Sequence, residues 1–377
     1  MDLAESNRIG VAYAKETVFG DGDLSTATTM RLTSESLNAE KATEISKEIR
    51  SDRMVSDVIE VGASSGGSLD GELSLGTYDE FYAAALSGVP GVTTDYTGSA
   101  DFTASSSDIV AVGAFVNVAV GQWVEVSGAT DPANNGFHLV VARASDDLVQ
   151  VGSTLVDAAE SVSIKGTMIR NGVEKTSFVF EKAFNDISVF EKFAGMRLGK
   201  FTVDATAKQI ATVNWEFMGT SVEVGDTSFV SSLVPPTSSE VVNATSDMGC
   251  VQINGTVSDT PIQKISLSID NKLREQDAVC SKYTVGIGYG QQEVTGSATL
   301  YFKDRSMLDT FLNHTDISIS FGFRDSTGRA LRFTVPSAKV TSNPVNASGT
   351  DTDIMQEIDF TAKLNPALGC QVQIDLA

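Results

Sequence analysis

Two adjoining segments decide the fold: Gly71-Glu-Leu-Ser-Leu75 and Thr77-Tyr-Asp-Glu-Phe-Tyr-Ala-Ala-Ala-Leu86. The first alternates apolar and polar residues, which is the pattern of a half-buried strand. In the second, apolar residues recur from Tyr78 at i, i+3, i+4 and i+7, which predicts a short helix over about residues 78–87. A strand that follows a Gly-rich turn and leads into a helix is therefore one unit of this fold.

The same unit recurs in the second half of the chain. Arg50–Gly62 matches Arg274–Gly286 with Arg, Val, Val and Gly in register. With one residue inserted, Gly71–Leu75 falls on Gly296-Ser-Ala-Thr-Leu300, and a second helical stripe follows Asp304. This repeat predicts a duplicated β-rich unit in which each copy carries one short helix.

Three segments lie outside the repeat. Residues 38–49 have no counterpart and are predicted to form a polar extension or hairpin loop. Residues 92–170 contain alternating strands of their own, with Trp123 as a core residue, and predict a small all-β domain inserted in the first copy. Residues 227–248, with adjacent prolines at 235 and 236, read as an extended linker.

Composition excludes several classes of function. The 377 residues include 27 Lys and Arg against 49 Asp and Glu, and the net charge of −22 opposes binding to phosphate backbones or anionic lipid. The three cysteines form no CxxC pair and fit a reducing compartment. The start of the sequence lacks the features of a signal peptide, and no stretch is apolar enough for a membrane span, so we expect a cytoplasmic product without a membrane partner.

Catalytic patterns are scarce. The two histidines, His138 and His314, provide little material for a metal site or a proton relay, and His138 is expected to be a half-exposed strand residue. Gly62-Ala-Ser-Ser-Gly66 satisfies G-x-S-x-G, but a strand follows instead of a helix, so a hairpin turn is the better interpretation. We predict no enzyme, no catalytic, cofactor-binding or metal-binding residue, and no cofactor. A glycosidase-type carboxylate pair stays an alternative, because such pairs meet only in three dimensions.

These segments resemble the tail tube (major tail) proteins of long-tailed bacteriophages. The resemblance rests on Arg50–Gly62, the Gly-rich turn, Gly71–Leu75 and Thr77–Leu86, and it extends to Ala14–Gly20 before Met30. It implies a mainly β protein with two tandem copies of a tail-tube β-sandwich or barrel domain, each with one short helix, and an inserted small all-β domain. The expected divisions are an N-terminal arm (1–29), a first tube domain (30–91 and 171–226), an inserted decoration domain (92–170), a linker (227–248) and a second tube domain (249–377).

The resemblance also implies a function. Two tube domains per chain imply trimeric rings with pseudo-sixfold symmetry, stacked into a hollow tube whose acidic lumen conducts double-stranded DNA during genome ejection without specific binding. The implied partners are further copies of the chain, the tape-measure protein, the tail terminator and distal tail or baseplate proteins. The implied location is the virion tail, assembled in the bacterial host cytoplasm. A decorated exterior favours a non-contractile, siphophage-type tail.

The loop from 38 to 49 is the candidate inter-ring stacking site. Its mixed charges suit a contact that is completed when rings stack, although an ordinary solvated loop would look the same. The residues assigned to this contact are Glu40, Lys41, Glu44, Lys47 and Glu48. The alternative function is a baseplate or fibre-type virion protein that binds host glycans through the inserted domain. Alternation alone does not identify the lumen-facing residues.

Overall fold

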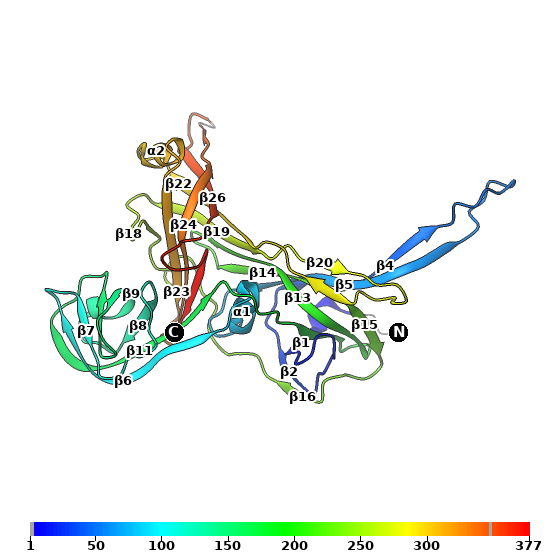
Figure 1. Ribbon diagram of the computed structural model, residues 1–377, viewed down its shortest axis with the longest axis horizontal. Helices are drawn as coiled ribbons and strands as arrows, with labels where there is room; N and C mark the ends of the chain where they lie inside the picture. Colours follow the sequence, from blue (N-terminus) through cyan, green and yellow to red (C-terminus); the bar gives the residue numbers. More distant parts are fainter. Residues whose placement is uncertain (1–3, 347–348) are drawn as a thin grey trace.

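The computed structural model describes residues 4–346 and 349–377, and most of its regular structure is β-strand. Its two α-helices are α1 (Asp79–Leu86) and α2 (Ser306–Leu312), and two short 3-10 helices occupy Ser6–Arg8 and Pro132–Asn134. Figure 1 shows a body of twisted sheets with a small barrel at one end and a long hairpin at the other. The expected mainly β fold is confirmed.

One long sheet runs through the body. The first half of the chain contributes β3 (Ser34–Glu35), β5 (Val58–Glu72), β14 (Thr212–Gly219) and β13 (Val189–Thr206), which pair in that order. The second half contributes β19 (Ile262–Asp270), β22 (Glu293–Tyr301), β26 (Met355–Ala362) and β24 (Ala330–Ser342), also in that order. Lys200–Thr206 of β13 pair antiparallel with Lys264–Asp270 of β19, so the two sets of strands form one sheet.

The helices occupy matching places in the two sets. Helix α1 follows β5, the second strand of the first set, and α2 follows β22, the second strand of the second set. Strand β13 also changes partners along its length, and glycine is required at the change: Gly195 has a φ of +68°, and a Cβ there would collide with Thr220.

In each half, further strands form a smaller outer sheet that covers the core on the side away from the polar face of the long sheet. In the first half, β1 (Ile9–Lys15) pairs with β2 (Thr26–Thr29) and with β12 (Phe178–Phe184), and β12 and β15 (Ser221–Gly225) pair with the first part of β13. In the second half, β17 (Gln252–Ile253) pairs with β18 (Thr256–Val257) and with β23 (Asp316–Arg324). Strand β23 pairs with Ala330–Lys339 of β24, and β27 (Gln373–Leu376) pairs with Leu331–Thr334 of the same strand.

The N-terminal segment and the segment that connects the two halves contain more regular structure than we expected from the sequence. Residues 1–29, expected as an arm, include β1 and β2 of an outer sheet, because Val11 and Tyr13 alternate inward onto the core; residues 1–3 lie outside the described residues. Residues 227–248, expected as an extended linker, include β16 (Ser232–Val234), which pairs parallel with β2. Val242, near the end of this segment, is buried.

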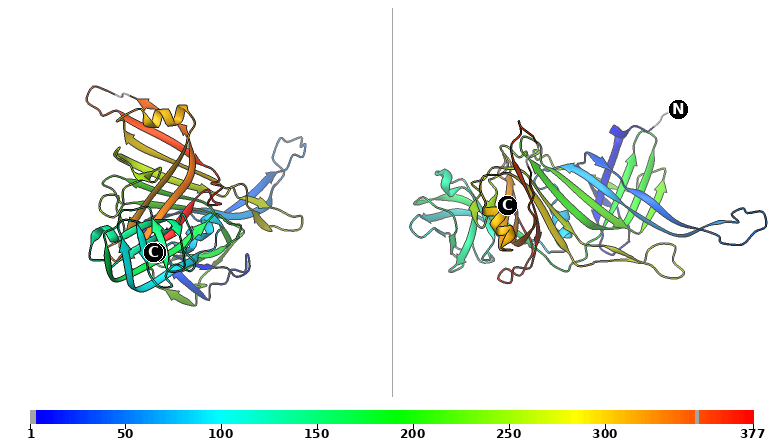
Figure 2. Two further views of the ribbon diagram at one scale, coloured as in Figure 1. Left: turned by 60° about the vertical axis from the view of Figure 1, so that its left-hand side comes forward. Right: turned by 90° about the horizontal axis from the view of Figure 1, so that it is seen from above.

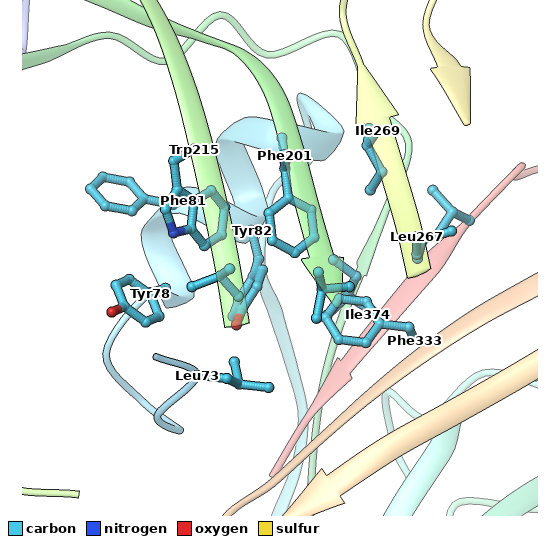
Figure 3. Packing of buried hydrophobic residues seen from close by; sticks show 14 of the residues in the cluster. Leu73, Tyr78, Phe81, Tyr82, Phe201, Trp215, Leu267, Ile269, Phe333 and Ile374 are labelled. Carbon is cyan, nitrogen blue, oxygen red and sulfur yellow. The ribbon is translucent and has the colours of Figure 1, made fainter. Parts of the chain in front are cut away.

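A single hydrophobic cluster joins both halves of the body. Figure 3 shows Tyr82 of α1 between rings of the long sheet and residues of the second half. The rings of Phe201 and Trp215 stack with centroids 4.3 Å apart, and the Tyr82 ring meets Phe333 edge-on at 6.0 Å. Because aromatic side chains bury large areas, these contacts fix α1 against the sheet.

Residues 91–170 form a closed six-stranded barrel with a core of its own. The barrel closes in the order β6–β7–β10–β9–β8–β11–β6. Its strands are β6 (Gly91–Thr103), β7 (Asp108–Val110), β8 (Trp123–Ser127), β9 (Gly136–Arg143), β10 (Leu148–Val151) and β11 (Ala158–Arg170). Trp123 is buried, as expected. The expectation of a half-exposed His138 is wrong: His138 is buried, its Nε2 lies 3.1 Å from the Asn134 carbonyl, and burial lowers its pKa.

The C-terminal strand β27 fixes this barrel to the body. It pairs on one side with Thr167–Arg170 of the barrel and on the other with Leu331–Thr334 of β24. The Asp375 carboxylate at this joint is fully buried and accepts a 2.8 Å hydrogen bond from the Gln373 amide, and burial raises its pKa to about 7.

Charged groups from both sides meet at the same joint. The Arg332 guanidinium lies 3.7 Å from the Trp123 ring centroid, and burial lowers its pKa to about 10. Arg324 of the second half forms a 2.9 Å ion pair with buried Glu125 of the barrel, whose pKa burial raises to about 7. The barrel is therefore a packed part of the molecule and is held by more than its two chain connections.

Candidate assembly and lumen surfaces

The long sheet has one apolar and one polar face. Along β13, Phe201, Val203 and Ala205 point into the core towards α1, so the residues between them face the opposite side. The same alternation in the neighbouring strands places carboxylates on this second face. They are Asp70, Glu72, Asp204, Glu216, Asp270, Glu293, Glu357 and Asp359.

Lysines on this polar face are held by its carboxylates. Lys200 Nζ lies 3.3 Å from Glu216, and Lys264 Nζ lies 3.3 Å from Asp204. Lys272, just beyond β19, contacts Asp270 at 2.8 Å. Such half-exposed pairs add little stability, but they leave no cluster of free positive charge along these strands. The polar face is therefore unsuited to holding a phosphate backbone.

The long sheet ends in open edges. Within the described residues, β3 pairs only with β5, and β25 (Val345–Asn346), which continues the line of β24, pairs only with β26. An open edge presents unpaired backbone N–H and C=O groups, which favour pairing with a further strand.

A long hairpin extends from the first half. Strand β4 (Asn38–Ile45) pairs with β5 and all its residues are exposed. Figure 1 and both views of Figure 2 show it reaching well beyond the body. The predicted extension over residues 38–49 is thus one arm of a hairpin together with part of its tip.

The five residues assigned to inter-ring stacking are spread along this hairpin. Glu40, Lys41 and Glu44 lie on β4, whereas Lys47 and Glu48 follow it, and all five are exposed. Lys41 forms an ion pair of 3.8 Å with Glu60 on the opposite arm. The charges line the hairpin without forming one cluster.

Sequence reasoning missed the apolar side chains of the same hairpin. Ile49 is fully exposed, and its neighbours near the tip expose half or more of their surface. Exposed apolar side chains gathered on one protruding hairpin make it a candidate contact region. These residues are Ile45, Ile49, Met54, Val55, Val58 and Ile59. The run from Met54 to Val61, rich in β-branched residues, was the signal available in the sequence.

The second half carries a shorter hairpin on the same side. Its strands are β20 (Arg274–Gln276) and β21 (Gly286–Gly288). The Ala63 N–H donates to the Lys282 carbonyl at 2.9 Å, and Lys282 pairs with Glu60 at 2.9 Å, which lowers the pKa of that carboxyl. The two hairpins are therefore joined along part of their length.

The structure shows the surroundings of the chemical motifs. The expected hairpin turn at Gly62–Gly66 is wrong: these residues lie inside the continuous strand β5. Ser64 of the G-x-S-x-G pattern therefore does not sit on a strand-to-helix turn either. Within residues 4–346 and 349–377, no group of three or more His, Cys, Asp or Glu residues could hold a metal ion. Cys250 and Cys280 are exposed free thiols and Cys370 is buried. No helix in this part of the chain is long and apolar enough to cross a membrane.

Comparison with known proteins agrees with this architecture. Residues 6–362 match a family described as phage tail tube protein. No curated protein matches the sequence. The match covers nearly the whole chain, including the barrel and both sets of strands. The chain therefore belongs to the phage tail tube protein family, whose role in the virion tail is structural.

Proposed function

We propose that three copies of this chain close into a ring, that rings stack into the hollow tail tube, and that the polar face of the long sheet lines a lumen for double-stranded DNA. The observation that carries this proposal is the β13–β19 junction inside the chain. It joins the last strand of one four-strand set to the first strand of the next.

The open edges repeat the two sides of that junction. Strand β3 is the first strand of the first set, as β19 is of the second, and the β24–β25 line ends the second set, as β13 ends the first. These matching orders support two tandem tube domains. A second copy can then pair its β3 with β24–β25 of the first, which is a head-to-tail contact that closes into a ring. Three chains supply six tube domains.

The face chemistry supports a lumen. The core and α1 occupy the opposite side of the long sheet, and the barrel is attached through β27 to an outer sheet, which suits an external decoration. An acidic wall whose lysines are already paired neutralises few phosphates, so DNA passes without being retained.

The hairpin of β4 and β5 supplies the stacking contact in this proposal. Its charged residues, Glu40, Lys41, Glu44, Lys47 and Glu48, orient the next ring, and the apolar tip provides the burial that stabilises the contact. Assembly then involves the tape-measure, terminator and distal tail or baseplate proteins, in the host cytoplasm.

Glycan binding through the barrel has less support. Sugar-binding surfaces generally use exposed aromatic rings, but Trp123 is buried beneath Arg332 at the joint with the body.

The test uses a variant in which residues 46–57 are replaced by a two-residue turn. We expect its smallest stable assembly to weigh three chains of 39.8 kDa each and to appear as a ring by electron microscopy. The wild-type protein should continue to hollow tubes. A variant and a wild-type protein that both stay monomeric at high concentration, or that form closed dimers, would contradict the proposal.

A further inference from the structure

The two helices differ sharply in burial. Six residues of α1, Phe81 to Leu86, are buried, whereas no residue of α2 is. Both helices follow the second strand of their set, so their sequence positions do not explain the difference. The helices differ in whether another part of the chain packs over them.

The second half of the chain covers α1. The side-chain amides of Asn271 and Gln292, at the turn region between β19 and β22, donate to the Ala85 carbonyl at 3.2 and 2.9 Å. They satisfy a carbonyl at the end of the helix that has no partner within the helix. Phe333 packs against Tyr82 from the same half.

Among the described residues, no segment covers helix α2 in this way. Met307 and Phe311 pack partly against the main core, but Leu312 is 75% exposed. Phe302 and Ile354, joined by a 3.0 Å backbone hydrogen bond, are also exposed. We call the three exposed residues Phe302, Leu312 and Ile354 the α2 face.

The α2 face adjoins the open edge of the sheet. The Asn343 side chain, between β24 and β25, donates to the Met307 carbonyl at 3.0 Å. A copy that pairs with β24–β25 therefore reaches α2 as well.

We propose that the first half of a second copy covers the α2 face, as the second half of this chain covers α1. The inference rests on the proposed ring and names its second contact. In the first half, the place of the β19–β22 turn region is taken by the base of the long hairpin, between β3 and β5. That base, from the neighbouring copy, meets the end of α2.

The test compares Leu312→Glu with Val112→Glu, which places the same charge at a 78% exposed valine of the barrel. Both monomers should melt like the wild type, because neither side chain packs in the core. Leu312→Glu should raise the protein concentration needed for ring formation about tenfold or more, because it buries an unpaired charge in the contact, whereas Val112→Glu should not. Assembly of Leu312→Glu at the wild-type concentration would overturn the inference.

Hydrogen exchange of wild-type protein separates this inference from the proposed function. Amides of α2 should exchange more slowly in rings than in monomers. If rings of three form and α2 exchanges as fast as in the monomer, the α2 contact is wrong and the ring stands. If no ring of three forms, both are wrong.

Discussion

Replacing Asp375 with asparagine should remove a pH dependence of stability that originates at the joint between barrel and body. Asp375 is fully buried, and burial raises its pKa from 3.8 to about 7. Between these values the folded protein keeps a proton that the unfolded chain has released. The free energy of unfolding therefore falls as the pH rises from about 4 to 7, by up to about 4 kcal/mol from this group.

Asparagine has the same shape and does not titrate in this range. At pH 4, Asp375→Asn and the wild type should have similar free energies of unfolding. At pH 8 the variant should be more stable by an amount that approaches about 4 kcal/mol. Urea unfolding of monomers at several pH values measures this, and the difference between the two proteins cancels the other titrating groups.

Glu125→Gln is a second test of the same reasoning at the same joint. It removes a second carboxyl whose pKa burial raises to about 7, so its effect should have the same sign. A difference between wild type and Asp375→Asn that does not change with pH, or that favours the wild type at pH 8, would refute the reasoning.

Three further predictions concern the lumen, the hairpin and the core. Glu216→Lys, Asp270→Lys and Glu293→Lys together add three lysines and free Lys200 and Lys272 from their carboxylate partners. The monomer of this variant should bind double-stranded DNA with a log-log salt slope of about −3 to −4.5, which fluorescence anisotropy measures; wild-type binding of equal strength would contradict an acidic, non-binding face. Replacement of residues 46–57 should permit rings and abolish tubes in electron micrographs, and tubes of normal length would argue against hairpin stacking. Tyr82→Phe should raise the free energy of unfolding by about 1 to 2 kcal/mol in urea titrations, because the buried Tyr82 hydroxyl has no hydrogen-bond partner among the described residues; a loss of stability would imply an unseen partner.

Local patterns predicted the elements that depend on local chemistry. The helix expected over residues 78–87 is α1 (Asp79–Leu86), and apolar spacing was enough to find it. The strand expected over Gly71–Leu75 differs: β5 ends at Glu72, and Leu73 and Leu75 are buried in the connection to α1. The same reasoning could not place His138, because alternation gives two faces of a strand but does not say which face the barrel buries. His138 and Val140 lie on the buried face, whereas Val141 on the other face is exposed.

The pairing of strands that are far apart in the chain could not be predicted from local sequence patterns. The β13–β19 junction joins residues far apart in the chain, and the role of β27 depends on two partners that only the fold brings together. The candidate stacking residues were chosen for their charge, whereas the exposed apolar tip around Ile49 became visible only once the hairpin was seen to leave the body.

Electron cryomicroscopy of tubes assembled from the wild-type protein tests the ring most directly. The account predicts three chains per ring, with β3 of one copy paired to the β24–β25 line of the next in a continuous sheet whose polar face surrounds the lumen. A tube with another number of chains per ring, or one in which these two edges face solvent, would contradict it.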